Sequence, residues 1–423
     1  RPPTGQAAVI VHLAFGLDEY DEADREFHEL VTSAGGEVLA HVGGSRRTPD
    51  PRYFVGGGKV DEIAELVVEH GAELVVFNHD LSPSQERNLE KRLNARVLDR
   101  AGLILDIFAS RARSHEGKLQ VELAQLEYLL PRLRRMWNHL SRIRGGIGLR
   151  GPGETQLETD RRLIGTRIGD LRRKLRDVAK ARAVQRKSRA GLFRVALVGY
   201  TNAGKSSLLR ALSGADLFVE DRLFATLDSA TRNVDLEGGY EALVTDTVGF
   251  IRKLPHHLVA SFRSTLEEAG EADVLLHVID ASHPDWEEQR QVVLEVLEDL
   301  ALDDRKKILV FNKTDRISEV ERESLQRRIR ALETTPAVFV SAHQADSLEA
   351  LKETLRARIR NRLASVTVRI PYADGEAIAA VYREGEVVHR VDEAMDVRLT
   401  ARLPRGVVGR LASRAGIEIE EVA

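Results

Sequence analysis

The chain has 423 residues, with 63 basic and 66 acidic side chains and a formal net charge of -3. It contains no cysteine, which excludes disulfides, thiolate catalysis and cysteine-based zinc sites and suits a reducing compartment. No apolar run approaches the roughly 20 residues that a membrane-spanning helix needs, and the sequence does not start with an apolar signal segment, so a cytoplasmic protein is expected. A chain of this length predicts three or four domains.

Residues 1–113 alternate strand-like and helix-like segments, which predicts a small parallel α/β domain. The expected strands are 9–15, 37–42, 74–78 and 95–98, and the expected helices are 21–34, 59–70 and 82–93. Within this domain, residues 53–59 read Tyr-Phe-Val-Gly-Gly-Gly-Lys and precede a helix. Two interpretations of this run stay open: a second anion site, or a plain strand-to-helix turn, since the spacing of a phosphate-binding loop is missing.

Residues 114–192 show heptads that predict two long antiparallel helices. Apolar residues recur at spacings of three and four in a first stripe, Leu119, Leu123, Leu126, Leu130, Leu133, Trp137 and Leu140. A second stripe does nearly the same, with one step of seven: Leu157, Ile164, Ile168, Leu171, Leu175 and Val178. Pro131 predicts a kink in the first helix, because it removes a hydrogen bond. From residue 132 to residue 194 there are 19 basic and five acidic residues, a balance of +14. We expect a basic helical hairpin, the arm, in which a helix of about 25 residues reaches about 37 Å.

The loop that joins the two predicted helices, residues 144–154, is rich in glycine and flanked by arginine. One interpretation is a flexible turn. The other, which we favour, is a contact with RNA, because this loop is longer than a helix connection needs and lies at the end of a rigid arm. Arg144 and Arg150 would then clamp phosphates, while Gly146 and Gly151 would let the nucleotide chain approach the backbone.

A phosphate-binding loop is predicted at residues 199–206, which have the spacing G-x-x-x-x-G-K-S. A short apolar strand, 195–198, precedes these residues, and a helix follows them. That order directs backbone N–H groups and the positive end of the helix at one anion, which disfavours the alternative of a chance glycine-rich turn. The residues assigned to the loop are Gly199, Tyr200, Thr201, Asn202, Ala203, Gly204, Lys205 and Ser206. Lys205 is expected to reach the β- and γ-phosphates of a nucleotide, and the Ser206 hydroxyl to ligate Mg²⁺.

Residues 193–362 again alternate strand-like and helix-like segments, so a second α/β domain is predicted. More side chains that could bind the same nucleotide lie within it. Switch I, which we define as residues 224–228, consists of Phe224, Ala225, Thr226, Leu227 and Asp228. Thr226 is expected to ligate the Mg²⁺ and to cover the γ-phosphate. A D-x-x-G run ends the next apolar strand and consists of Asp246, Thr247, Val248 and Gly249. Asp246 can hold the metal through water, and the Gly249 N–H can contact the γ-phosphate.

Recognition of guanine is indicated by an N-K-x-D run that follows a third apolar strand and consists of Asn312, Lys313, Thr314 and Asp315. The Asp315 carboxylate can accept hydrogen bonds from guanine N1–H and the exocyclic amine, which adenine does not offer in that arrangement. We therefore expect GTP and GDP rather than ATP. A later loop able to touch the base from the other side contains Ser341, Ala342 and His343.

The last residues, 363–423, return to short elements and predict a small α+β domain. The whole chain is thus expected to be an α/β multidomain protein. A P-loop GTPase domain would be preceded by the parallel α/β domain and the long antiparallel hairpin, and followed by the α+β domain.

The sequence resembles the HflX family of ribosome-associated GTPases, which belongs to the Obg-HflX group of translation-factor-related GTPases. The most specific segments are 53–59, 145–158 and 246–256. The resemblance implies an arm that enters the ribosome on the large-subunit side with its glycine-rich loop near the peptidyl-transferase region. It also implies GTP-dependent binding to the large subunit and splitting of stalled or idle ribosomes, notably under heat stress. One departure is Ser229, where the family usually has proline, so a more flexible switch I is expected.

Phe250 directly follows the D-x-x-G run, where many GTPases have a glutamine that orients the attacking water. We predict slow intrinsic hydrolysis of GTP, with Lys205, Thr226 and Gly249 as catalytic residues, and stimulation by ribosomes. The free protein is expected to be a monomer. Two alternatives remain: a passive GTP-controlled module that binds or sequesters ribosomes without splitting them, and an N-terminal ATP site with RNA-unwinding activity near residues 56–59.

Overall fold

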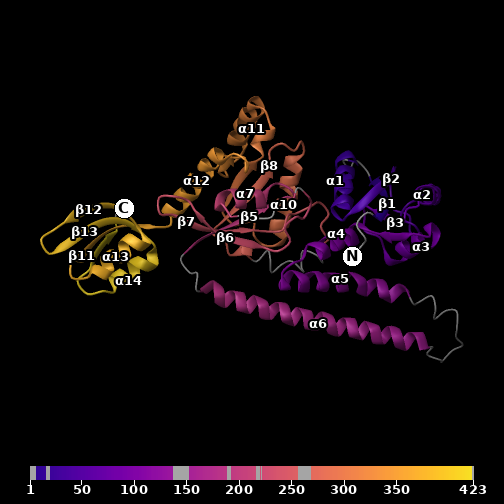
Figure 1. Ribbon diagram of the computed structural model, residues 1–423, viewed down its shortest axis with the longest axis horizontal. Helices are drawn as coiled ribbons and strands as arrows, with labels where there is room; N and C mark the ends of the chain where they lie inside the picture. The colour runs from indigo at the N-terminus through magenta and orange to yellow at the C-terminus, as the bar shows by residue number, and fades with distance from the viewer. Residues whose placement is uncertain are drawn as a thin grey trace.

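The computed structural model describes residues 6–15, 20–136, 152–187, 192–215, 220, 222–255 and 268–421. Three β-sheets follow one another along the molecule, and two long helices run side by side along the first two (Figure 1). No helix within the described ranges has both the length and the apolar character needed to cross a bilayer.

The N-terminal sheet has four parallel strands in the order β2-β1-β3-β4. Its strands are β1 (Gln6–Phe15), β2 (Gly36–Arg46), β3 (Leu74–Phe77) and β4 (Arg96–Leu98), and its helices are α1 (Tyr20–Ser33), α2 (Gly57–His70), α3 (Pro83–Leu93) and α4 (Arg100–Arg111). The inner strands β1 and β3 are largely buried, as expected for a parallel sheet that is covered on both faces. The predicted parallel α/β fold is confirmed.

Helix α4 was not among the predicted elements of this region. Its residues from Arg100 to Leu105 are all buried, so the sequence lacks the one-sided apolar stripe of a surface helix. The helix begins because the Asp99 carboxylate caps it, accepting a hydrogen bond from the Gly102 N–H at 2.8 Å.

The arm consists of α5 (His115–Met136) and α6 (Pro152–Lys187), which lie side by side (Figure 1). The predicted apolar stripes meet between them, with Leu119, Leu123, Ile168 and Leu171 buried at their contact. Helix α5 continues through Pro131 and also packs against α3 and α4. Helix α5 therefore lies along helices of the N-terminal region, and α6 packs on α5.

The central sheet has six strands in the order β10-β9-β8-β5-β7-β6, of which only β6 runs antiparallel to its neighbour. Its strands are β5 (Phe193–Gly199), β6 (Ala230–Asp235), β7 (Glu241–Asp246), β8 (Val274–Asp280), β9 (Lys307–Asn312) and β10 (Ala337–Phe339). Its α-helices are α7 (Lys205–Ser213), α10 (Trp286–Asp299), α11 (Glu319–Leu332) and α12 (Glu349–Arg360). Four of the predicted nucleotide-binding motifs follow the carboxyl ends of the parallel strands β5, β7, β9 and β10, so the sheet gathers them along one edge. Switch I instead lies between α7 and β6.

The C-terminal sheet is antiparallel, with the order β12-β13-β11-β14, and agrees with the predicted α+β fold. Its elements are β11 (Ala364–Pro371), α13 (Gly375–Glu384), β12 (Glu386–Asp392), β13 (Asp396–Leu403), α14 (Arg405–Ala412) and β14 (Glu418–Glu421). The Tyr240 hydroxyl of the central region donates to Glu386 at 2.5 Å, which ties this sheet to the rest of the chain.

Candidate nucleotide-binding site

The phosphate-binding loop turns from β5 into α7 at two glycines that tolerate no side chain. A Cβ at Gly199 would lie 2.3 Å from the Val278 carbonyl oxygen of β8. Gly204 has a φ of +91°, and a Cβ there would lie 2.3 Å from the Asn312 side-chain nitrogen. Close packing of the loop against β8 and β9 therefore explains both glycines.

Lys205 is buried within this loop, with 6% of its surface exposed. Its Nζ donates to the carbonyl oxygens of Gly199 at 3.1 Å and of Tyr200 at 2.8 Å. Burial lowers the pKa of Lys205 to about 8, against the opposing effect of the Asp246 carboxylate and with a smaller contribution from the charge on Lys313. A cation held across the loop in this way is positioned to meet an anionic ligand.

Three oxygen-bearing side chains meet beside Lys205. The Ser206 hydroxyl lies 2.6 Å from the Thr226 hydroxyl and donates to Asp246 Oδ2 at 2.5 Å. Asp246 is buried, and its Oδ1 has no hydrogen-bond partner among the described residues. Burial raises the pKa of Asp246 above its ordinary value. Because Mg²⁺ prefers hard oxygen ligands, this donor set with one orphaned buried oxygen fits the ion.

The D-x-x-G run is packed against the phosphate-binding loop. A Cβ at Gly249 would lie 2.7 Å from the Thr201 Cα and 2.9 Å from Lys205 Nζ. The Phe250 N–H donates to the Gly199 carbonyl at 3.1 Å, and the Thr201 N–H donates to the Phe250 carbonyl at 2.7 Å. The structure therefore brings Gly249 directly beside the loop that would hold a γ-phosphate.

Asn312 connects the phosphate-binding loop to the loop that carries residues 341–343. Its side-chain nitrogen donates to the Ala203 carbonyl at 3.0 Å, and its side-chain oxygen accepts from the Ala342 N–H at 3.1 Å. Lys313 is ion-paired with Asp280 at 2.6 Å. The motifs predicted to surround a guanine base thus adjoin the phosphate site.

Asp315 is exposed at this end of the site, where the Ser341 hydroxyl donates to its Oδ1 at 2.5 Å. Burial works against ionisation, but the hydrogen bond from Ser341 and a backbone hydrogen bond hold the pKa of Asp315 below its ordinary value. The group is an ionised acceptor held in a fixed orientation, as the recognition of guanine would require.

A cleft at the phosphate end is lined by Thr201, Asn202, Gly204, Lys205, Ser206, Ser207, Glu220, Arg222, Phe224, Ala225, Thr226, Thr247 and Gly249. Sequence reasoning missed Glu220 and Arg222. They precede switch I outside any motif, and only the placement of that loop over the phosphate-binding loop could have indicated them.

Several predicted residues lie near the cleft but direct their side chains elsewhere. Tyr200, Leu227 and Val248 are buried in the hydrophobic core, and the ring of Phe224, a residue that also lines the cleft, packs there too. Asp228 faces the start of α5, where it accepts hydrogen bonds from backbone N–H groups. The predicted RNA-contact residues Arg144, Gly146, Arg150 and Gly151 lie outside the described residues.

Residues 53–56 lead into α2, with Gly56 as its N-cap residue, and residues 57–59 form its start. Lys59 is paired with Glu62 at 2.8 Å, and a Cβ at Gly56 would lie 2.5 Å from an Arg46 guanidinium nitrogen. The segment is thus a turn into a helix, and both interpretations given above stay open.

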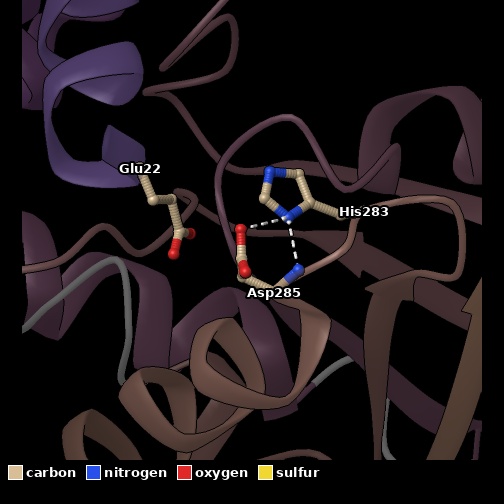
Figure 2. A group of neighbouring side chains, drawn as sticks. All are labelled: Glu22, His283 and Asp285. Atoms are coloured by element: carbon tan, nitrogen blue, oxygen red, sulfur yellow. Dashed lines mark hydrogen bonds and ion pairs between the residues drawn. The ribbon is translucent and has the colours of Figure 1, made fainter. Parts of the chain in front are cut away.

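A separate group of possible metal ligands joins α1 to the loop before α10 (Figure 2). Ligand atoms of Glu22, His283 and Asp285 lie within 4.8 Å of one another. Glu22 is already ion-paired with Arg252 at 2.7 Å. Burial raises the pKa of Glu22 to about 7, against the opposing charge of Arg252. Because a guanidinium supplies the positive charge here, we assign no metal to this group.

Three family profiles match the chain in succession. They are described as "GTP-binding GTPase N-terminal" at residues 21–109, "GTP-binding GTPase Middle Region" at residues 111–189 and "50S ribosome-binding GTPase" at residues 194–313.

Similar proteins are found in distant bacteria. A protein named GTPase HflX from Escherichia coli (strain K12) is 47% identical over 408 residues, which cover 96% of this chain and 95% of that protein. Another GTPase HflX, from Magnetococcus marinus, is 46% identical over 410 residues, which cover 95% and 94%. A third, from Flavobacterium psychrophilum, is 50% identical over 290 residues, which cover 69% and 70%.

Proposed function

This chain belongs to the HflX family of ribosome-binding GTPases and hydrolyses GTP, and we propose that it binds the large ribosomal subunit in its GTP state and splits stalled or idle ribosomes. Heat stress is the proposed condition under which this activity is needed. The proposed setting is the cytoplasm, with the free protein a monomer that is partly bound to ribosomes.

The observation that carries this proposal is the attachment of a strongly basic arm to the GTPase region. Arg182 near the end of α6 donates to Glu268 at 2.8 Å and is also paired with Glu116 of α5 at 2.7 Å. The sequence of the arm and its joining loop has an excess of positive charge. Ribosomal RNA is a polyanion, so such an arm supplies binding free energy that is independent of base sequence.

We propose that the nucleotide is GTP, held by the phosphate-binding loop and by Asp315, and that Mg²⁺ is held by the Ser206 and Thr226 hydroxyls with Asp246 acting through water. The ion would neutralise charge on the β- and γ-phosphates. Support comes from the short distances between these oxygens and from the orphaned Asp246 Oδ1.

In the proposed mechanism, Lys205 and the Gly249 N–H stabilise negative charge that develops on the γ-phosphate, and Thr226 covers it. Phe250 is buried, with 1% of its surface exposed, and its ring has no group that can hydrogen-bond to a water molecule. Hydrolysis is therefore slow in the free protein and faster when the ribosome orders the site.

The proposal is tested by co-sedimentation of the protein with purified ribosomal subunits in GDP and in a non-hydrolysable GTP analogue. We expect co-sedimentation with the large subunit in the analogue and weaker binding in GDP. Equal binding in both nucleotides would contradict nucleotide control.

Light scattering of intact ribosomes separates splitting from passive binding. A splitting factor lowers the scattering signal as subunits separate, whereas a sequestering module leaves it unchanged or raises it. An unchanged signal, together with normal co-sedimentation, would favour the passive alternative.

A further inference from the structure

Switch I is bonded to the first residues of the arm through Asp228. The backbone N–H groups of Arg113 and Ser114 donate to Asp228 Oδ2 at 2.9 and 2.8 Å, and the Ser114 hydroxyl donates to Oδ1. Helix α5 begins at His115, so this carboxylate lies at the positive end of the helix and satisfies N–H groups that precede its first turn.

Ser114 has a second hydrogen bond that fixes its hydroxyl. Its Oγ accepts from the Gly117 N–H at 2.8 Å, the bond of a helix-capping serine. One hydroxyl therefore caps α5 and donates to switch I at the same time.

Gly117 leaves the space that Asp228 occupies. A Cβ at this position would lie 2.2 Å from Asp228 Oδ1. Glycine within a helix costs stability relative to alanine, by about 1 kcal/mol, so its presence in the first turn of α5 accords with a close approach by another group.

Two more contacts hold the same loop against the corner between α4 and α5. The Phe224 ring meets the Phe108 ring edge to face, with centroids 4.8 Å apart. Glu220, which precedes switch I, is ion-paired with Arg111 at 2.5 Å. The corner between α4 and α5 therefore contacts this loop at three places: before switch I at Glu220, within it at Phe224, and at its end at Asp228.

Thr226 lies between two of these attachment points, Phe224 and Asp228, and faces Ser206. We propose that Ser114 is a positioning residue for GTP hydrolysis: through Asp228 it holds switch I so that Thr226 faces the metal and the γ-phosphate. By the same bonds, a movement of switch I releases the start of α5. This inference deepens the proposed function and rests on the role given there to Thr226.

The first test compares Ser114→Ala with the unaltered protein in single-turnover GTP hydrolysis. Loss of a hydrogen bond to a charged acceptor should lower the hydrolysis rate about tenfold. GDP affinity should stay within about twofold, because GDP lacks the γ-phosphate that Thr226 would cover. The conservative variant Ser114→Thr should restore the rate.

Ser110→Ala is the matched control, since the Ser110 hydroxyl donates only to the Ile107 carbonyl within α4 at 2.7 Å. It should hydrolyse GTP at the unaltered rate. A second variant, Gly117→Ala, crowds Asp228 without removing any donor and should slow hydrolysis as Ser114→Ala does. The positioning role would be overturned if Ser114→Ala and Gly117→Ala both hydrolysed GTP at the unaltered rate, or if their GDP affinity fell as much as their hydrolysis rate.

Hydrogen exchange supplies a readout that a merely structural role would not change. Amide protection at residues 115–118 should differ between GDP and a non-hydrolysable GTP analogue in the unaltered protein, and Ser114→Ala should reduce this difference. Identical protection in the two nucleotides would overturn the coupling. Failure of the unaltered protein to hydrolyse GTP would instead refute the proposed mechanism, so the two failures can be distinguished.

Discussion

The hydroxyl of Tyr200, in the phosphate-binding loop, donates to the carboxylate of Glu26, which stands 174 positions earlier in helix α1. The same hydroxyl accepts from the Arg252 N–H at 2.9 Å. Arg100 donates to Glu26 at 2.5 Å and to the Arg252 carbonyl at 2.9 Å. The N-terminal region therefore binds both the phosphate-binding loop and the segment that follows D-x-x-G.

Replacing Tyr200 with phenylalanine should destabilise this junction. The change leaves one Glu26 oxygen and the Arg252 N–H without the Tyr200 hydroxyl, at a cost of about 1–3 kcal/mol. We expect a lower thermal unfolding temperature in scanning calorimetry. Tyr372→Phe is the control, because the Tyr372 hydroxyl bonds to Asp392 at an exposed surface. Equal unfolding temperatures for the two variants would argue against the junction.

Asp315→Asn should change the base that the protein prefers. The asparagine NH₂ can donate a hydrogen bond to the 2-oxo group of xanthine. Facing the 2-amino group of guanine, it would place two donors against each other. We expect GDP affinity to fall at least about a hundredfold and xanthosine diphosphate affinity to rise. Competition against a fluorescent nucleotide measures both. Asp346→Asn, at a nearby exposed carboxylate, should leave both unchanged, and undiminished GDP binding by Asp315→Asn would remove Asp315 from the base site.

Nucleotide binding should take up a proton at alkaline pH. The pKa of Lys205 is about 8 in the free site, and nearby phosphates favour the charged ammonium and raise it. Above pH 8 the free lysine is mostly neutral, so binding protonates it and affinity falls as pH rises.

Calorimetry of GDP binding in two buffers of different ionisation enthalpy measures that proton. We expect uptake of most of a proton at pH 9, where the nucleotide's own phosphates are already ionised, and much less uptake by Lys205 at pH 7. Lys205→Arg, which is always charged, should show no uptake at either pH. Equal uptake by the unaltered protein at both pH values would conflict with the low pKa.

Replacing Arg144 and Arg150 together with alanine should weaken co-sedimentation with the large ribosomal subunit and leave GTP affinity unchanged. If each arginine contacts one phosphate, the salt dependence of binding should become shallower by about one unit of log-log slope per arginine. Arg173→Ala is the control, because Arg173 is paired with Asp170 within α6. Unchanged binding and splitting would refute the assigned role of the loop.

The sequence predicted the sheets and the phosphate-binding loop well because their signals are local: apolar strands, glycine spacing and turns between them. Helix α4 is not predicted from the sequence, because its first six residues are all buried and so lack the alternation of apolar and polar faces that marks a surface helix. In residues 363–423 the sequence pattern predicts strands at 366–370, 386–391 and 396–403 and helices at 375–382 and 407–412, but not strand β14, because three of its four residues are glutamate and it pairs with β11 alone among the described strands.

The direction of single side chains was harder to predict than the position of motifs. Asp228 is expected at the nucleotide because it belongs to switch I with Thr226, yet its partners are the N–H groups of Arg113 and Ser114, just before a helix that begins over a hundred residues earlier. The hydrogen bond from Tyr200 to Glu26 is equally unpredictable from the sequence, since no repeating pattern relates the two segments. Such contacts depend on how separately folded sheets dock.

Helix α6 contains 36 residues and is therefore about 54 Å long. It packs along α5, and near one end Arg182 pairs with Glu116 and Glu268 beside the GTPase region. If α5 and α6 turn as one body about that end, an angular change of about 5° would carry the opposite end through about 5 Å, roughly the pitch of one helical turn. The length of the hairpin thus turns a small rotation against α3 and α4 into a displacement comparable to the spacing of neighbouring nucleotides.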